Sequence, residues 1–264
     1  MSPGEPEILI LPTAADASEV AARRIAAALT AAVADRGVGH WVTTGGSTPG
    51  AIYRDLAGPG LVDSVPWDSA HLWWGDDRWV PPEDVLSNAL ACWDLLLRNV
   101  PIPLDQVHPM RIGEALAAGV GPPAVATQYE AAIRAEHLPL DPAGFPRFDV
   151  ILIGVGSDGH LFSVFPGSAT WDDPSWVQAV PAPSHIAPHV ARVTLHPRVI
   201  DATNLPIVVA HGTGKAPIVG RIFGARASER DLPALLARRG GALWILDEAA
   251  ATDLPAAVRA ASVD

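Results

Sequence analysis

The chain is poor in cysteine, in basic residues and in long apolar runs. Its 264 residues include one cysteine, Cys92, so no disulfide can form within the chain, which is typical of a protein in the reducing cytosol. Lysine and arginine number 18 against 29 acidic residues, and the net charge is −11. Because an acidic chain repels nucleic-acid phosphates and anionic lipid headgroups, we expect neither a nucleic acid nor a membrane as partner.

Segments that direct a protein to a membrane are also missing. No apolar run reaches the roughly 18–20 residues that a membrane span needs. The first residues, MSPGEPEILILP, have no basic region, and their apolar run is too short for a signal peptide. We therefore expect a cytoplasmic protein. The residues do not determine the oligomeric state, and our expectation is a monomer or a weak homodimer.

What the chain does contain is an alternation of short apolar runs and amphipathic stretches, with 49% hydrophobic residues overall. The predicted strands cover residues 7–12, 40–45, 71–76, 148–155, 192–196, 205–212 and 241–250. The predicted helices cover residues 17–37, 45–57, 87–100, 122–138 and 215–223, with a short one after 250; Ser18 is the expected N-cap of the first and Gly37 its end. Cys92 falls in the pattern LACWDLLL and is expected to pack in the core.

This alternation predicts an α/β fold with a doubly wound, mainly parallel sheet and helices on both faces, in a single domain over residues 1–264. Ligands of such sheets bind outside the carboxyl ends of the strands. Functional residues are therefore expected in the loops after the strands. Four of these loops have unusual compositions: TTGGSTPG, WWGDDRWVPPE, GVGSDGH and AHGTGK.

The loop TTGGSTPG has the composition of a phosphate site. Gly45 and Gly46 allow the backbone to approach a ligand, Ser47 and Thr48 offer hydroxyl groups, and Pro49 suits the first turn of a helix. A helix N-terminus presents free N–H groups to an anion. An ordinary strand–turn–helix connection with a hydroxyl cap is the alternative. The lysine of a P-loop is missing.

Two further loops carry charge at the end of a strand. In WWGDDRWVPPE, Asp76, Asp77 and Arg78 could polarise or clamp a substrate oxygen, although their spacing alone favours a surface ion-pair cluster. In AHGTGK, glycines follow a buried strand and Lys215 opens a helix. An exposed helical lysine is the simpler interpretation, but beside a phosphate loop Lys215 would add a point charge.

The segment IGVGSDGH contains the spacing G-x-G-x-x-G of the dinucleotide-binding fingerprint. That fingerprint requires a long helix directly after the glycines and an acidic residue at the end of the next strand. Here Pro166 and Gly167 interrupt any helix, and Asp172 follows no strand pattern. What remains is Asp158 and His160 on a glycine-rich turn, where a histidine can act as general base beside a carboxylate, or be a hydrogen-bonded structural residue.

Metal and nucleophile motifs do not support other chemistries. His185 and His189 form H-x-x-x-H, but Pro188 between them opposes the helix that this motif needs, and there is neither H-E-x-x-H nor a cysteine pair. We therefore expect no metal at the site. The nucleophile elbow G-x-S-x-G is also absent.

Taken together, these loops resemble the 6-phosphogluconolactonase family, which is related to glucosamine-6-phosphate deaminases and isomerases. The matching segments are TTGGSTP, WWGDDRWVPPEDVLSN, FDVILIGVGSDGHLFSVFPGS, RVTLHPRVIDAT and GTGK, in the family's order, from about residue 41 to 225. The resemblance implies hydrolysis of 6-phospho-D-glucono-1,5-lactone, a small sugar phosphate lactone, to 6-phosphogluconate. This is the second step of the oxidative pentose phosphate pathway, and no cofactor is implied.

The resemblance also implies roles for individual residues. His160 matches the general base with Asp158 as its neighbour, and Arg78 matches a residue that faces the lactone end, near Asp76. Asn88 matches a position near the substrate. The residues that match the phosphate site are Gly45, Gly46, Ser47, Thr48, Arg192 and Lys215. The chain departs from the family at Asp77, where glutamate is usual, and at His196, to which the sequence assigns no role.

Two alternatives remain open. The deaminases share the G-x-G-x-D-G-H loop but typically continue into Phe-Asn-Glu-Pro, whose glutamate completes a ring-opening relay, whereas no carboxylate follows His160 here until Asp172. They also lack the RVTL segment and the Asp-x-Arg pattern. A sugar-phosphate-binding protein without catalysis is the second alternative, but regulators of that kind carry a DNA-binding module, for which this acidic chain has neither room nor a basic patch.

Overall fold

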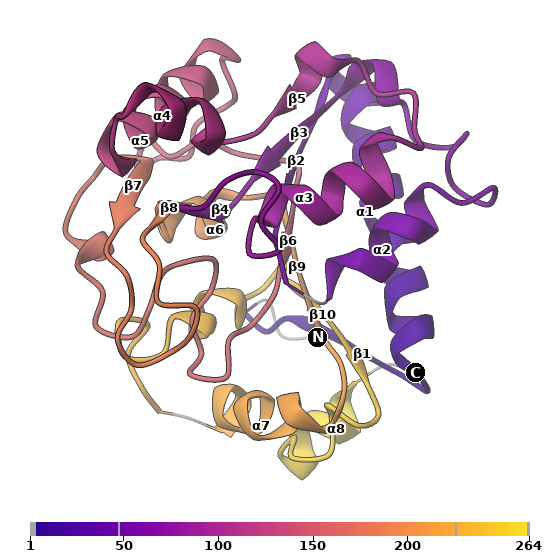
Figure 1. Ribbon diagram of the computed structural model, residues 1–264. Helices are drawn as coiled ribbons and strands as arrows, with labels where there is room; N and C mark the ends of the chain where they lie inside the picture. The colour runs from indigo at the N-terminus through magenta and orange to yellow at the C-terminus, as the bar shows by residue number, and fades with distance from the viewer. Residues whose placement is uncertain (1–3, 47, 225, 263–264) are drawn as a thin grey trace.

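The fold is built on a seven-stranded parallel sheet in the order β1-β10-β9-β6-β2-β3-β5 (Figure 1). The computed structural model describes residues 4–46, 48–224 and 226–262. The strands are β1 Glu7–Leu11, β2 Gly39–Thr43, β3 Ala70–Trp74, β5 Val107–His108, β6 Val150–Ile153, β9 Leu205–Ala210 and β10 Leu243–Asp247. The central strands are apolar without alternation because both faces of the sheet are covered.

Helices cover both faces of this sheet, as the sequence predicts. The helices are α1 Ala14–Arg36, α2 Pro49–Leu56, α3 Asn88–Cys92, α4 Ile112–Ala118, α5 Pro122–Ala135, α6 Arg198–Ala202, α7 Ala216–Gly224 and α8 Ala256–Ala261. One apolar core contains side chains of α1, α2 and α3, and a second contains side chains of α5, α6 and α7. Figure 1 shows α1, α2 and α3 on one side of the sheet and α4 and α5 on the other.

Local details differ from the prediction at two helices. The first helix begins earlier than expected, because Thr13 and Asp16 form a reciprocal capping box; Ser18 is therefore not its N-cap but a buried residue inside it. Gly37 ends the helix as predicted. The segment predicted as one helix over residues 87–100 is α3 followed by a π-helical turn, Trp93–Leu97, and Cys92 is buried in the core as expected.

None of the helices in the described part of the chain is both long enough and apolar enough to cross a bilayer.

A second, antiparallel sheet of three short strands was not predicted. It consists of β7 Val177–Val180, β8 Arg192–Leu195 and β4 Asp76–Arg78, in the order β4-β8-β7. The run at residues 192–196 was predicted as a strand, but it belongs to this sheet rather than to the parallel one. Register places Arg78 opposite Arg192. The small sheet therefore brings two distant parts of the chain together beside the loops of interest.

The strand order places the four unusual loops side by side. Strands β9, β6, β2 and β3 are consecutive in the sheet, and each is followed by one of these loops. The direction in which the chain builds the sheet reverses between β2 and β6, which are paired through Trp41 and Val150. Such a reversal is the point at which doubly wound sheets bind their ligands.

Candidate active site

A cavity of about 290 Å³ lies where these loops meet, and most of the predicted site residues line it. Asp158 and Arg192 do not line the cavity but lie behind its wall, and Ser47 lies outside the described residues. The predicted residues that line it are Gly45, Gly46, Thr48, Asp76, Arg78, Asn88, His160 and Lys215. The fold thus brings together residues from four loops that span about 170 positions of the chain.

His160 and Asp158 form a tight pair. The Nδ1 atom of His160 lies 2.6 Å from the Oδ1 atom of Asp158, and the same carboxylate oxygen accepts the backbone N–H of His160 at 3.1 Å. Because a carboxylate only accepts hydrogen bonds, Nδ1 carries the proton and Nε2 keeps its lone pair. Burial raises the pKa of Asp158, but the bonds and charge of His160 outweigh it and hold that pKa well below its usual value.

The backbone around the pair is shaped to receive the imidazole ring. A Cβ atom on Gly156 would lie 2.1 Å from the ring of His160, so only glycine leaves room for it. On its other side the ring packs against Phe165, with ring centroids 4.9 Å apart. The imidazole is therefore held in place by Asp158, Gly156 and Phe165 together.

Asp76 is buried and held from both sides. The Nδ2 atom of Asn88 donates to Asp76 Oδ1 at 3.0 Å, and the hydroxyl of Ser163 donates to Oδ2 at 2.5 Å. Among the described residues the Oδ1 atom of Asn88 has no hydrogen-bond partner. A Cβ atom on Gly45 would lie 1.7 Å from that oxygen, so the glycine loop lies directly against Asn88. This amide oxygen is therefore buried beneath the glycine loop, and Asn88 acts in the cavity wall by holding Asp76.

The acidic pair after β3 is not the surface ion-pair cluster that its spacing favours, because Asp76 and Asp77 are only 3% and 6% exposed. Asp77 accepts the backbone N–H groups of Asn88 and Arg78 at 2.7 and 2.8 Å, and burial raises its pKa to about 6. Arg78 donates through Nη1 to the carbonyl of Leu86 at 2.9 Å. These bonds fix Arg78 in the cavity wall as a cation with a defined direction.

Two further cations lie close to the cavity but differ in access. Lys215 lines it, and its Nζ atom donates to the carbonyl of Val155 at 2.6 Å. Arg192 is 2% exposed and donates through Nη2 to the carbonyl of Pro188 at 3.0 Å. Burial lowers the pKa of both side chains. Lys215 can reach a ligand directly, whereas Arg192 acts in this geometry mainly through its charge.

Sequence reasoning missed three residues of the site. His185 donates through Nε2 to the second oxygen of Asp158, at 2.9 Å, so Asp158 lies between two imidazoles. Phe162 lines the cavity with a left-handed backbone (φ 52°), and its ring fills the space that a Cβ on Gly75 would need. Ser163 holds Asp76. Phe162 and Ser163 follow His160 within three positions, and this proximity is the only local signal in the sequence for any of the three residues.

A larger cavity of about 670 Å³ lies beyond Phe165 and His185. Its lining includes Asp173 but neither lysine nor arginine. A phosphate group requires cations or converging N–H donors, so the larger cavity is the poorer place for an anionic ligand.

The smaller cavity therefore has the properties of an enzyme site for a small anionic substrate. A histidine–carboxylate pair opens on one side, cations and a glycine loop lie on the others, and all of them follow parallel strands at the reversal point of the sheet. Fold and site together are therefore those of an α/β enzyme that acts on a small anionic molecule.

Comparison with known proteins identifies the family. Residues 12–245 match the family model described as glucosamine-6-phosphate isomerases/6-phosphogluconolactonase, and the chain belongs to this family of enzymes. Proteins named 6-phosphogluconolactonase from Mycobacterium tuberculosis and Mycobacterium bovis are each 37% identical over 237 residues, which is 89% of this chain and 93% of theirs.

Solved structures show the same fold. The 6-phosphogluconolactonase of Trypanosoma brucei is 29% identical, with a TM-score of 0.79 over 96% of this chain and 100% of that one. The enzyme of the same name from Trypanosoma cruzi gives a TM-score of 0.82 at 28% identity, over 96% and 98% of the two chains. A monomeric glucosamine-6-phosphate deaminase has a TM-score of 0.76 at 17% identity, over 94% and 99%, which shows a shared fold alone.

Proposed function

We propose that this protein hydrolyses 6-phospho-D-glucono-1,5-lactone to 6-phosphogluconate, the second step of the oxidative pentose phosphate pathway, with His160 as the general base. The observation that carries the proposal is that His160, paired with Asp158, lines a cavity that is also lined by Arg78, Lys215 and the glycine loop. The names of the relatives support the same activity.

The substrate is oriented by its phosphate. Gly45, Gly46, Ser47 and Thr48 with Lys215 bind the phosphate group, and the charge of Arg192 behind the wall adds to the positive potential there. Asn88, which is among the lining residues, lies near the sugar. Binding energy from this remote end then positions the lactone carbonyl near His160 and Arg78.

The reaction needs one base and one cation. Nε2 of His160 takes a proton from water while the water oxygen bonds to the lactone carbonyl carbon, and Asp158 stabilises the imidazolium that forms. Arg78 stabilises the tetrahedral oxyanion. The carbon–ring-oxygen bond then breaks, and the imidazolium returns its proton to the departing ring oxygen. No other co-reactant is consumed.

The deaminase alternative requires a carboxylate soon after His160. The residues that follow are Leu161, Phe162 and Ser163, of which Leu161 and Ser163 are buried and Phe162 lies in the cavity wall without an ionisable group. The hydroxyl of Ser163 is already bonded to Asp76. The site therefore lacks the acidic group that a ring-opening relay would use.

The test compares the wild-type protein with His160→Ala and with His137→Asn, an exposed histidine that serves as the matched control. Lactone hydrolysis is measured at mildly acidic pH, where the spontaneous reaction is slow, with glucosamine 6-phosphate as a second substrate. We expect fast hydrolysis by the wild type and by His137→Asn. His160→Ala is expected to lose roughly 100- to 10,000-fold in kcat, because it removes the general base.

Normal kcat in His160→Ala would contradict the assignment of the base. Ammonia release from glucosamine 6-phosphate without lactone hydrolysis would move the protein to the deaminase branch of its family. Tight binding of 6-phosphogluconate without turnover of either substrate would instead indicate a binding protein.

A further inference from the structure

A second group of polar side chains lies at the edge of the parallel sheet, around β3 and β5. His71 is the second residue of β3, His108 is the last residue of the edge strand β5, and Glu136 follows the last turn of α5. These residues are 28 or more positions apart in the sequence, so no local motif marks them. One potential metal-ligand atom from each lies within 4.8 Å of the others.

The separations within this group are those of ligands around one ion. The Nδ1 atom of His71 lies 3.0 Å from Nε2 of His108 and 3.4 Å from Oε2 of Glu136. Two donors bound at about 2.0–2.1 Å in a tetrahedral zinc site are roughly 3.3 Å apart. The ligand atoms of the third pair, His108 and Glu136, lie within 4.8 Å of each other. An inward adjustment of these two side chains would place all three ligand atoms around a common centre.

Hydrogen bonding alone does not account for the group. The single atom Nδ1 of His71 faces both an imidazole nitrogen and a carboxylate oxygen. If Nδ1 carries a proton, it has one hydrogen for two acceptors. If it does not, its lone pair faces the negative carboxylate of Glu136. A metal cation between the three atoms removes this conflict, because each atom then donates a lone pair to the cation.

The surroundings hold the imidazole of His108 in place. Trp73 stacks on His108 with ring centroids 3.8 Å apart, and it donates through Nε1 to His40 at 3.3 Å. The carboxyl end of α5, where Glu136 lies, also favours a cation.

We propose that His71, His108 and Glu136 bind one Zn²⁺ ion, with water as the fourth ligand. Two imidazoles and one carboxylate match the ligand preference of zinc among divalent metals. The ion would tie the two-residue edge strand β5 and the end of α5 to β3, and so stabilise an edge of the sheet. It lies at the edge of the sheet, and none of its three ligands lines the cavity in which we place the chemistry.

The test uses tag-free protein that has been freed of metal with a chelator, and ZnCl₂ as the probe. Calorimetric titration is expected to show one Zn²⁺ per chain, and zinc is expected to raise the Tm. Glu136→Gln keeps the size of the side chain and is expected to weaken binding by at least about tenfold, because it removes a charged ligand. His71→Asn, with an imidazole lost, should weaken it further.

His137→Asn is the matched control, since His137 is the exposed neighbour of Glu136 and lies outside the group. Its zinc affinity should equal that of the wild type. A Tm measured without zinc establishes that each variant is folded, and Co²⁺ bound in place of zinc should give visible absorption that Glu136→Gln loses. Absence of zinc binding by the wild type, or equal binding by wild type and Glu136→Gln, would overturn the proposal.

Discussion

At the scale of single residues, the position of His160 depends on a neighbour that has no side chain. Gly156 lies where any Cβ would enter the imidazole ring, whereas Gly154 two positions earlier has no atom within 4 Å of the corresponding point. Both glycines belong to the segment that resembles a dinucleotide fingerprint. Their roles differ because only Gly156 faces the ring of His160.

This close approach can be tested with a pair of glycine variants. Gly156→Ala is expected to lower kcat for lactone hydrolysis by roughly 100-fold, because a displacement of His160 by about 1 Å misaligns the base and its water. Gly60→Ala is the control, because Gly60 is exposed, lies outside the cavity and has no atom within 4 Å of an added Cβ; it is expected to leave kcat within a few-fold of the wild type. Equal kcat values for the two variants would show that the ring of His160 does not depend on Gly156.

His196, to which the sequence analysis assigns no role, is explained by its local contacts. Its Nδ1 atom accepts the backbone N–H of Arg198 at 3.0 Å, at the start of α6, and its ring stacks on Phe145 with centroids 4.7 Å apart. It lies in the core and not in the cavity. His196 is therefore a structural residue that satisfies a free N–H group at a helix N-terminus.

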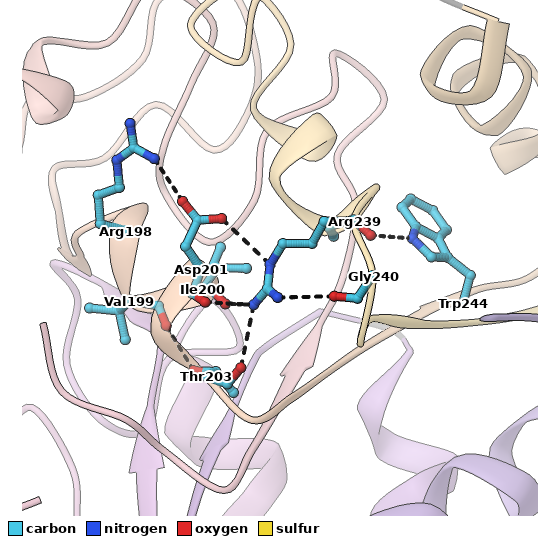
Figure 2. A network of polar contacts seen from close by, with 9 residues as sticks. Arg198, Val199, Ile200, Asp201, Thr203, Arg239, Gly240 and Trp244 are labelled. Atoms are coloured by element: carbon cyan, nitrogen blue, oxygen red, sulfur yellow. Dashed lines mark hydrogen bonds and ion pairs between the residues drawn. The ribbon is translucent and has the colours of Figure 1, made fainter. Parts of the chain in front are cut away.

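At the scale of elements, short α6 is stabilised mainly at its carboxyl end. Figure 2 shows the guanidinium of Arg239 among the last carbonyl groups of this helix. Its Nη2 atom donates to the carbonyls of Ile200, Asp201 and Thr203 at 2.7, 2.8 and 3.3 Å. A helix of five residues is too short to supply N–H donors for these carbonyls. Arg239, which is distant in the sequence, supplies the hydrogen-bond donors instead.

Arg239→Met tests this contact because methionine keeps much of the length but has no donor. The free energy of unfolding is expected to fall by about 1–3 kcal/mol, since the partly buried carbonyls lose their bonds. Arg221→Met, on the exposed side of α7, is the control and is expected to change it by less than about 0.5 kcal/mol. Urea unfolding of the three proteins gives the comparison, and equal midpoints would contradict the role of Arg239.

At the scale of the whole molecule, buried neutral histidines link stability to pH. Burial lowers the pKa of His40 to about 3 and that of His196 to about 4, against an ordinary value of 6.5. Below pH 6.5 the unfolded chain therefore binds protons that the folded protein does not. The contribution of these residues is complete above pH 6.5 and is lost as the pH falls towards 4.

We expect each of these two histidines to cost on the order of 3 kcal/mol of stability by pH 4. Asp77 has the opposite sign, because its raised pKa of about 6 favours the folded state at low pH, and it offsets only part of the loss. Urea unfolding at pH 7, 6, 5 and 4, with chelator present, should show falling stability. His196→Asn should flatten the slope between pH 6.5 and 4, and an unchanged slope would contradict this account.

The arrangement of the sheet explains how a protein with a negative net charge can attract an anionic ligand. With a net charge of −11, the protein as a whole repels a phosphate. Arg78 and Lys215 lie in the wall of one small cavity, and Arg192 lies behind it. The attraction for a phosphate is therefore local to this cavity. It arises because the loops after four neighbouring strands of the sheet meet there.

The sequence by itself determined the parts of this protein that depend on local patterns. Apolar runs and amphipathic stretches predicted six of the seven strands of the main sheet and its longer helices, but not the two-residue β5 or the short helices α4 and α6. Most of the predicted cavity residues do line one cavity. The second sheet was not predicted, because β4 and β7 are only three and four residues long and the residues of β4 are all charged. Such strands form through pairing with β8 and not through their own periodicity.

Only the tertiary structure decided which distant side chains meet. It placed His185 on Asp158, buried the acidic pair that spacing assigned to the surface, and moved Arg192 behind the cavity wall. It also assembled His71, His108 and Glu136, which no motif connects. The physical reason is that periodicity and glycine placement act within a few residues, whereas contacts between separate strands depend on strand order and register, which no short stretch of sequence contains.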